Sequence, residues 1–388
     1  MPATFLLRPR FVSARASNSG PRSQDVGIWI AFARCDGHPP DLVPTGANQV
    51  IAVGCNGDYK FLMELSIIEG NPQPPGATVL AVATRDKKVL RTAYWSCGEN
   101  CAGTIAILQG RMEFIEKYFE VIGELLARNF DVAILDWRGQ GGSARLTKNP
   151  RKGHVGDFRA YQRDLDAFVA EVLAIHCRPP WFALAHSMGG AIALANARSG
   201  RSPFARMVLT SPMVDLYGLR FRRTLRFLVR VLVYLGQGRL FLPFFGGAKS
   251  AVPGSFEGNI LTSDENRYAR NAAIIEAAPE LAIGGPTTGW TNAAFRIMRR
   301  FKQAEFPRRL LTPVLIIAAG ADRVVDSAAT EEFASRLKAG KCIILRRARH
   351  EILMEADPLR ELFWAAFDAF LPGEPAQTLR PVGSGVGA

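Results

Sequence analysis

From about residue 77 onward, short apolar runs of strand length alternate with segments of helical periodicity. The runs lie at residues 104–108, 132–135, 181–185, 207–210, 314–318 and 342–345. Strands that alternate with helices form a parallel sheet that carries helices on both of its faces. Two further runs, at 77–83 and 90–95, flank a charged turn and predict an antiparallel hairpin. The sequence therefore predicts an α/β fold with a mostly parallel sheet.

One long insertion interrupts this alternation. Residues 214–305 are helical in pattern and lie between two predicted strands, so we expect a helical cap on a core made of residues 74–213 and 306–371. Residues 1–73 are irregular and repeatedly interrupted by proline, and we expect a poorly ordered leader of unassigned role. The Pro- and Gly-rich residues 372–388 predict a disordered tail. No apolar run reaches the roughly 18 residues that span a bilayer.

The most specific local pattern is the junction between the run at 181–185 and an alanine-rich helical segment. Ser187 lies there, in Ala185-His186-Ser187-Met188-Gly189. A serine between small residues, where a strand turns into a helix, is typical of a nucleophile elbow, whose strained turn exposes the hydroxyl. Alanine stands here in place of the usual first glycine. The alternative is a serine that only caps the helix.

A serine nucleophile needs a histidine base and a carboxylate that orients it, in the chain order serine, acid, histidine. Asp322 follows the predicted strand at 314–318, and His350 follows the one at 342–345. Parallel sheets carry their sites at the carboxyl ends of their strands. We therefore expect Ser187, Asp322 and His350 to form a catalytic triad.

Other residues compete for these roles. Asp215 also follows a strand and is an alternative acid, and Asp326 is a third choice. His186 is next to the serine in sequence, but neighbours at a tight turn point in different directions. His154 and His176 are expected to be structural or solvated.

The mechanism also needs two N–H groups that stabilise the oxyanion. The first is expected from Met188, which follows the nucleophile at the start of its helix. The second should come from the loop after an early strand, which is Gln109-Gly110-Arg111. We expect the backbone N–H of Arg111 to be this donor, with that of Gln109 as the alternative.

With these motifs in order, the chain resembles the bacterial lysophospholipase and monoacylglycerol lipase branch of the α/β-hydrolases over residues 77–371. The chain departs from the family pattern at two places. Ala185 replaces the first glycine of the elbow, and Gln109-Gly110 stands where many members have His-Gly. The resemblance implies the triad named above, an inserted cap, and ester hydrolysis through an acyl-enzyme. The matching segments are residues 108–118, 136–141, 153–155, 161–166, 186–190 and 349–351.

No cofactor and no metal are expected. Residues 139–144 match the Gly-x-Gly-x-x-Ala pattern of dinucleotide-binding loops, but a basic loop follows them instead of the required helix. Cys97 and Cys101 have no second pair that would complete a zinc site, so free thiols are expected.

The chain is strongly basic, with 48 Lys and Arg against 35 Asp and Glu and a net charge of +13. Residues 1–73 contribute none of this surplus, whereas residues 215–310 hold fifteen basic and seven acidic residues, a surplus of eight. Over residues 219–235 arginines alternate with apolar residues. This pattern indicates a helix that lies on an anionic membrane or, alternatively, an ordinary cap helix with its arginines in water.

We therefore expect the substrate to be a lipid ester with one acyl chain, above all a lysophospholipid. The expected location is cytoplasmic, with peripheral contact to the inner membrane face through the basic cap as an option. No nucleic-acid partner is expected, because the sequence has no stacking-aromatic or helix-turn-helix pattern. Three alternatives stay open: a monoacylglycerol lipase or general carboxylesterase, a prolyl-type aminopeptidase, which the basic cap disfavours, and a non-catalytic ligand-binding scaffold.

Overall fold

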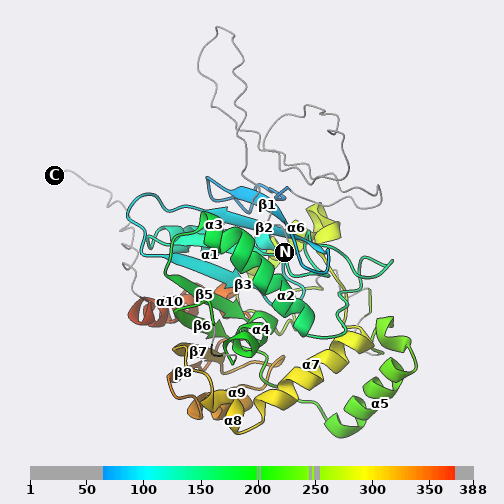
Figure 1. Cartoon of the computed structure of the whole chain (residues 1–388). Coiled ribbons are helices and arrows are strands. Elements are labelled where there is room, and N and C mark those ends of the chain that lie inside the picture. Colours follow the sequence, from blue (N-terminus) through cyan, green and yellow to red (C-terminus); the bar gives the residue numbers. More distant parts are fainter. Residues whose placement is uncertain (1–63, 199, 201, 244–246, 249–253, 372–388) are drawn as a thin grey trace, which may run out of the picture.

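The computed structural model describes residues 64–371 apart from 199, 201, 244–246 and 249–253 (Figure 1). The predicted tail and residues 1–63 of the predicted leader lie outside these residues. The described end of the leader is tied to the core. Asn71 is buried, and its side-chain amide donates to the backbone carbonyl of Glu116 at 2.9 Å.

Eight strands form one sheet in the order β1-β2-β4-β3-β5-β6-β7-β8 (Figure 1). β2 is antiparallel to β1 and β4, and all other neighbours are parallel. The predicted hairpin and the predicted mostly parallel sheet are therefore confirmed. The strands are β1 (Thr78–Ala83), β2 (Val89–Trp95), β3 (Thr104–Leu108), β4 (Asp131–Leu135), β5 (Trp181–His186), β6 (Arg206–Thr210), β7 (Val314–Ala319) and β8 (Gly340–Leu345).

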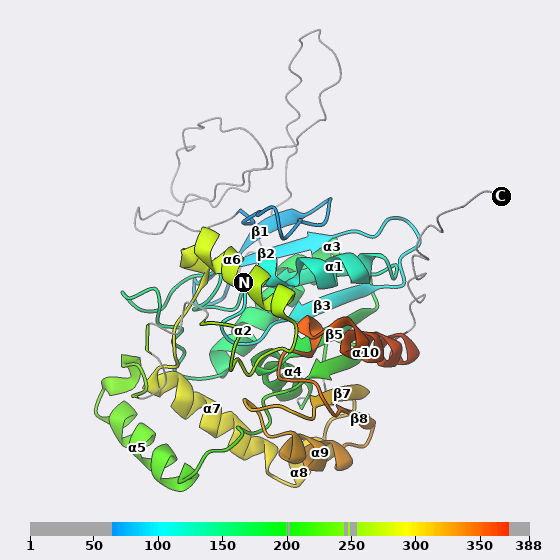
Figure 2. The ribbon, with the colours of Figure 1, turned by 180° about the vertical axis from the view of Figure 1, so that it is seen from behind.

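Helices cover both faces of the sheet, as predicted (Figures 1 and 2). One apolar core contains Phe168 of α2, Ile192 of α4 and Phe301 of α7, and the other contains Phe119 of α1 and Phe367 of α10. The helices are α1 (Phe119–Leu126), α2 (Arg159–Phe168), α3 (Ala174–His176), α4 (Met188–Ala197), α5 (Arg222–Tyr234), α6 (Glu265–Ala277), α7 (Thr288–Phe301), α8 (Glu305–Arg308), α9 (Ser327–Ser335) and α10 (Asp357–Phe370).

The central strands β3, β4 and β7 are buried along their whole length. Their sequences are continuous apolar runs without alternation, as expected for strands that helices cover on both faces. Since β3 and β5 to β8 run parallel, the loops after them gather at one edge of the sheet.

The inserted residues divide into two parts. α5 and α7 lie side by side in both views, and α7 is largely buried (Figures 1 and 2). α6 lies apart from them, where Arg267 forms an ion pair with Glu120 of α1 at 2.6 Å. None of the helices in the described residues is long and apolar enough to cross a membrane.

Candidate active site

Ser187 lies between the end of β5 and the start of α4 with φ 49° and ψ −111°, a conformation that non-glycine residues rarely adopt. Close packing of the following helix explains the glycines there. A Cβ on Gly189 would lie 1.9 Å from the backbone oxygen of Leu108, and one on Gly190 would lie 2.8 Å from Cβ of Pro212. The strained turn at Ser187 and the small residues after it therefore belong to one closely packed junction between β5 and α4.

Backbone hydrogen bonds hold this turn from both sides. The N–H of Ser187 donates to the carbonyl of Thr210 at 3.0 Å, and the N–H of Met213 donates to the carbonyl of Ser187 at 2.9 Å. Both partners belong to β6 or the loop after it. The neighbouring strand therefore maintains the conformation that the serine would not adopt alone.

The structure brings Ser187, His350 and Asp322 together in one hydrogen-bonded line. Nε2 of His350 lies 3.0 Å from Oγ of Ser187, and Nδ1 lies 2.8 Å from Oδ2 of Asp322. All three residues are buried. This is the arrangement of a nucleophile, a base and the group that orients the base.

The carboxylate of Asp322 is held in its charged form. Burial opposes ionisation, but the hydrogen bond with His350 outweighs it and lowers the pKa of Asp322. Two backbone N–H groups, of Val324 and Val325, also donate to its Oδ1 at 2.7 and 2.9 Å. An ionised Asp322 can accept a hydrogen bond from a protonated Nδ1 of His350, which leaves Nε2 free to act as the base.

The alternative acids have other partners. The carboxylate of Asp215 forms ion pairs with Arg222 and, at 2.6 Å, with Lys302. Asp326 caps the start of α9, where its side chain accepts from the N–H of Ala329 at 3.0 Å. Each of these contacts gives the carboxylate a structural role, so neither acid needs a role in the reaction.

The other candidate histidines are also accounted for by structure. Nδ1 of His186 lies 3.1 Å from Oγ1 of Thr210, and its burial lowers its pKa to about 4. His154 contacts Thr287 of the insertion at 2.9 Å. His176 stacks on a tyrosine ring.

The loop after β3 is shaped by a carboxylate. Glu113 accepts a hydrogen bond from the backbone N–H of Gly110, and Met112 has φ 69° in the left-handed region. In the described part of the chain, no hydrogen bond with a protein acceptor is found for the backbone N–H of Arg111 or for that of Met188. Both groups are therefore free to donate to a substrate, although their role as oxyanion donors stays a prediction.

A buried ionic cluster behind this loop was not predicted. Lys117 bridges Glu113 and Glu351 at 2.8 and 2.7 Å, and Tyr118 donates to Glu113 at 2.8 Å. Burial opposes the charge on Glu113, but Lys117 outweighs it and lowers the pKa of Glu113 to about 2. Glu351 follows His350, so the cluster joins the loop after β3 to the histidine loop.

The side chain of Arg111 is unusual among the charged groups of the site. Its Nη2 donates to the carbonyl of Gly284 at 2.8 Å, and the guanidinium lies 5.1 Å from the ring centre of Trp290. Its Nε is buried and has no hydrogen-bond partner among the residues that the structure describes. Burial lowers its pKa to about 10, and it forms no ion pair with any carboxylate of the described residues.

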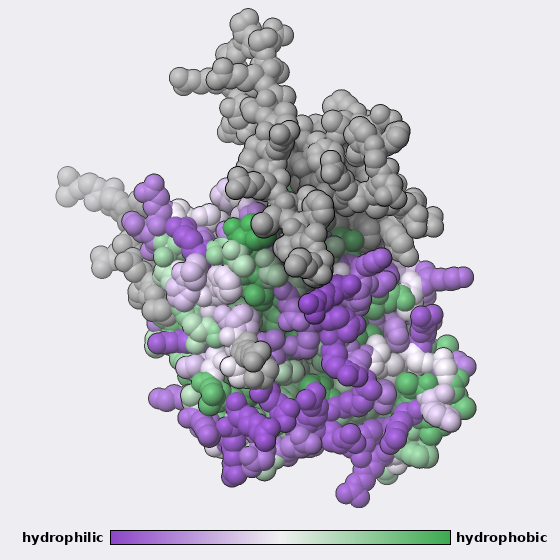
Figure 3. Space-filling view, in the orientation of Figure 1, coloured by the Kyte–Doolittle hydropathy of each residue, from purple (hydrophilic) through white to green (hydrophobic). Residues whose placement is uncertain are grey.

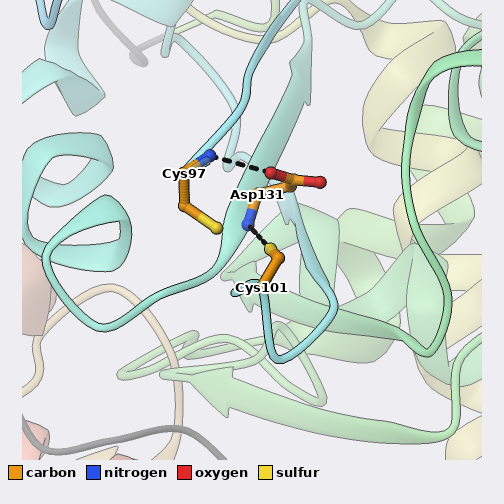
Figure 4. Close-up of side chains that lie close together, drawn as sticks. All are labelled: Cys97, Cys101 and Asp131. Atoms are coloured by element: carbon orange, nitrogen blue, oxygen red, sulfur yellow. Dashed lines mark hydrogen bonds between the residues drawn. The ribbon is translucent and has the colours of Figure 1, made fainter. Parts of the chain in front are cut away.

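Far from the triad, near the start of β4, the structure brings Cys97, Cys101 and Asp131 together (Figure 4). Both oxygens of Asp131 are already engaged, because Arg178 donates to each of them and the N–H of Cys97 donates to one at 2.8 Å. The sulfur of Cys101 accepts from the N–H of Asp131 at 3.0 Å. These contacts hold neighbouring loops together, and this structural role accounts for the proximity of the three residues.

Comparison with known proteins identifies a family and several relatives of this chain. A model of the Hydrolase_4 family, described as serine aminopeptidase, S33, matches residues 99–357. Lysophospholipase L2 of Escherichia coli strain K12 is 32% identical over 272 residues, which cover 66% of this chain and 77% of that protein. Monoglyceride lipase of Homo sapiens is 26% identical over 245 residues, which cover 62% and 72%.

Solved structures show the same fold. A soluble variant of monoglyceride lipase from Saccharomyces cerevisiae, in complex with a substrate analogue, has a TM-score of 0.61 at 18% identity. The match covers 78% of this chain and 98% of that one. A monoacylglycerol lipase from Paleococcus ferrophilus has a TM-score of 0.57 at 19% identity, over 73% and 98% of the two chains.

Proposed function

This chain belongs to the Hydrolase_4 family of α/β-hydrolases and is related to lysophospholipase L2 and monoglyceride lipase, and on that premise we propose that it is a lysophospholipase. The proposed reaction removes the single acyl chain of a lysophospholipid by hydrolysis of its carboxylic ester. The observation that carries the proposal is the line from Ser187 through His350 to Asp322, with contacts of 3.0 and 2.8 Å.

In the proposed reaction, Oγ of Ser187 attacks the ester carbonyl while Nε2 of His350 takes its proton. Asp322 keeps the imidazole oriented and stabilises its cation. The N–H groups of Met188 and Arg111 donate to the oxyanion. Collapse of the intermediate releases the alcohol, which takes the proton from His350, and leaves the acyl group on Ser187. Water, activated by His350, then releases the fatty acid.

The test uses a fluorophosphonate that labels activated serines and an assay of fatty-acid release from a lysophospholipid. We expect the wild-type protein to be labelled and to release fatty acid, and we expect Ser187→Ala to lose both. Ser211, a buried serine in the loop after β6, provides the matched control variant Ser211→Ala. A Ser187→Ala protein that retained full activity would exclude the proposed mechanism.

Arg111 favours a phosphate-bearing substrate over a neutral monoacylglycerol. If its N–H is the oxyanion donor, its guanidinium lies within one side-chain length of the reacting carbonyl. The guanidinium is a rigid fork of donors that suits a phosphate, and this one has a buried Nε without a partner. A lysophospholipid carries its phosphate on the same glycerol as the ester. The proposed headgroup contact therefore supplies the anion that Arg111 lacks.

A second part of the proposal concerns the membrane. The face of α5 and of the residues beside it exposes large apolar side chains, among them Phe221, Phe227 and Tyr234, which are 78%, 65% and 89% exposed. Hydrophobic side chains also gather at this edge of the molecule in Figure 3. Exposed arginines stand between them, and residues 216–256 contain no acid. Such a helix suits the headgroup layer of an anionic membrane.

The family description includes aminopeptidases, so that activity needs a separate argument. An aminopeptidase requires a carboxylate that binds the substrate amine. In the insertion, Asp215 and Asp264 are ion-paired with arginines, and the surplus of eight positive charges over residues 215–310 disfavours an ammonium group. These charges favour the lysophospholipase.

A further inference from the structure

A pocket of about 860 Å³ lies away from the triad, where core and insertion meet. Its wall is formed by the β1–β2 turn, by the loop between β4 and α2, by the first turns of α2, and by Arg239 of the insertion. In the view of Figure 3, hydrophilic side chains gather over α2 and the loop that precedes it. The size is within the range of small-molecule sites in proteins, about 300–1,000 Å³.

Six basic side chains line this pocket against two acidic ones, and both acids are already neutralised. Asp86 pairs with Arg138 at 2.6 Å and with Arg163 at 3.1 Å, and these contacts hold its pKa well below the usual range. Asp157 pairs with Arg159 and Arg296, at 3.0 and 3.2 Å. Neither acid is left to balance the remaining cations. The six basic residues are Lys88, Arg138, Arg145, Lys148, Arg163 and Arg239.

Four of these cations have no carboxylate partner among the residues that the structure describes: Lys88, Arg145, Lys148 and Arg239. Arg145 shows the consequence most clearly. Its guanidinium donates only to neutral carbonyl oxygens, of Ser143 at 3.3 Å and of Glu280 at 2.5 Å. Burial lowers the pKa of Arg145 to about 10. An anion in the pocket would stabilise its charged form.

The pocket is separate from the site of ester hydrolysis. His154 belongs to its wall, but no residue of the triad and no residue of the loop after β3 lines it. A Cβ on Gly153 would lie 3.4 Å from Nη2 of Arg111. Gly153, which precedes His154 of the pocket wall, therefore lies next to the Arg111 guanidinium, which does not itself line the pocket. Lys88 belongs to the core and Arg239 to the insertion, so one ligand can touch both.

We propose that this pocket is a second binding site, which takes a phosphate-bearing anion and joins the insertion to the core through it. Four unpaired cations from separate segments match the several oxygens and charges of a phosphate group. The ligand is either a soluble organic phosphate or the headgroup of an anionic phospholipid. Both share the chemistry that the pocket recognises, and the experiment distinguishes them.

The test measures binding by calorimetry on full-length Ser187→Ala protein, so that hydrolysis does not contribute and the outcome is independent of the proposed activity. The probes are pyrophosphate, glycerol 3-phosphate and vesicles of phosphatidylglycerol, at constant ionic strength. The variant Lys88→Ala/Lys148→Ala removes two unpaired cations. The control Lys338→Ala/Lys341→Ala removes two lysines after α9 and in β8, away from the pocket.

We expect saturable binding that the Lys88→Ala/Lys148→Ala variant weakens about tenfold or more and that the control leaves unchanged. Binding of the soluble phosphates identifies a free ligand, and vesicle binding that Lys88→Ala/Lys148→Ala weakens, without binding of the soluble phosphates, identifies a lipid headgroup. Melting temperatures check that both variants are folded. Absence of saturable binding to every probe, or binding that Lys88→Ala/Lys148→Ala weakens no more than the control variant does, would overturn the proposal.

Discussion

Arg111 combines two roles that are usually separate. Its backbone is the proposed oxyanion donor, and its side chain is a half-buried cation with a buried Nε, which no carboxylate of the described residues neutralises. A charge that is buried without a counterion is costly, so its retention beside a reacting group points to a ligand that supplies the counterion. We therefore expect substitution of the Arg111 side chain to change substrate selectivity.

We expect Arg111→Met to lower kcat/KM for a lysophospholipid about 10- to 100-fold more than for a monoacylglycerol with the same acyl chain. The backbone N–H is kept in the variant, so the neutral substrate is the internal reference for the chemistry itself. Arg111→Lys should restore part of the difference, since it keeps the charge but not the fork. Equal losses on both substrates would contradict a role in headgroup recognition.

The lowered pKa of His186 leads to a prediction of how the free energy of unfolding depends on pH. Burial lowers its pKa from 6.5 to about 4, so between these values the unfolded chain binds a proton that the folded chain does not. Stability therefore falls as the pH falls through this window, by about 3 kcal/mol in total. Glu113, whose pKa is also lowered, adds to the loss only below about pH 5.

The measurement is the free energy of unfolding in urea at pH 6.5 and 5, for the wild type and for His186→Gln. The wild type should lose stability over this interval, and the variant should lose less. His176→Gln is the matched control, because that histidine is exposed. An identical pH dependence in wild type and His186→Gln would show that His186 does not cause it.

At the scale of elements, α5 is the helix whose environment is least complete. Among its thirteen residues only Val229 is buried. Most amphipathic helices hide their apolar face against a core, yet here Phe227 and Tyr234 face solvent. The charge and the exposed apolar area together support docking on an anionic surface.

We expect the wild type to bind vesicles that contain phosphatidylglycerol and to bind them less at high salt. Phe227→Ser/Tyr234→Ser should weaken this binding about tenfold, because it removes two apolar side chains from the lipid boundary. Ile175→Ser/Leu362→Ser removes two apolar residues elsewhere that are 62% and 56% exposed, and it should have no effect. Vesicle binding that is unaffected by salt and by the α5 variant would contradict the proposed contact.

At the scale of the whole molecule, one carboxylate joins helices that are distant in sequence. Glu120 of α1 forms ion pairs with Arg267 and Arg270 of α6, at 2.6 and 2.5 Å, and with Arg360 of α10 at 3.2 Å. Burial opposes its charge, but Arg267 and the other arginines lower its pKa to about 2. Its contribution to stability is therefore present above about pH 4.5 and is lost as the pH falls toward 2.

We expect Glu120→Ala to reduce the free energy of unfolding by about 1–3 kcal/mol at pH 7, since three arginines lose their shared partner. Amide exchange in α6 should increase as well, because this helix is held to the core through the same carboxylate. Glu332→Ala, at an exposed ion pair on α9, should cost little by comparison. A neutral effect of Glu120→Ala would show that apolar packing alone holds α6.

The sequence by itself determined the order of the elements and the nucleophile. Hydrophobic period, turn residues and the small residues around Ser187 are relations between near neighbours, and such relations can be read along a chain. The fold class and the family resemblance were confirmed for this reason. Even the strain at Ser187 was expected, although the backbone hydrogen bonds that maintain it come from Thr210 and Met213, in β6 and the loop after it.

Only the tertiary structure decided which groups meet. Asp215, Asp322 and Asp326 all follow strands or begin helices, and nothing local distinguishes them. The fold places Asp322 against His350, whereas Asp215 forms ion pairs with Arg222 and Lys302. The same is true of the unpaired cations at Arg111 and in the second pocket. Whether a charge is paired depends on segments that are distant in sequence, and the packing of the fold alone brings those segments together.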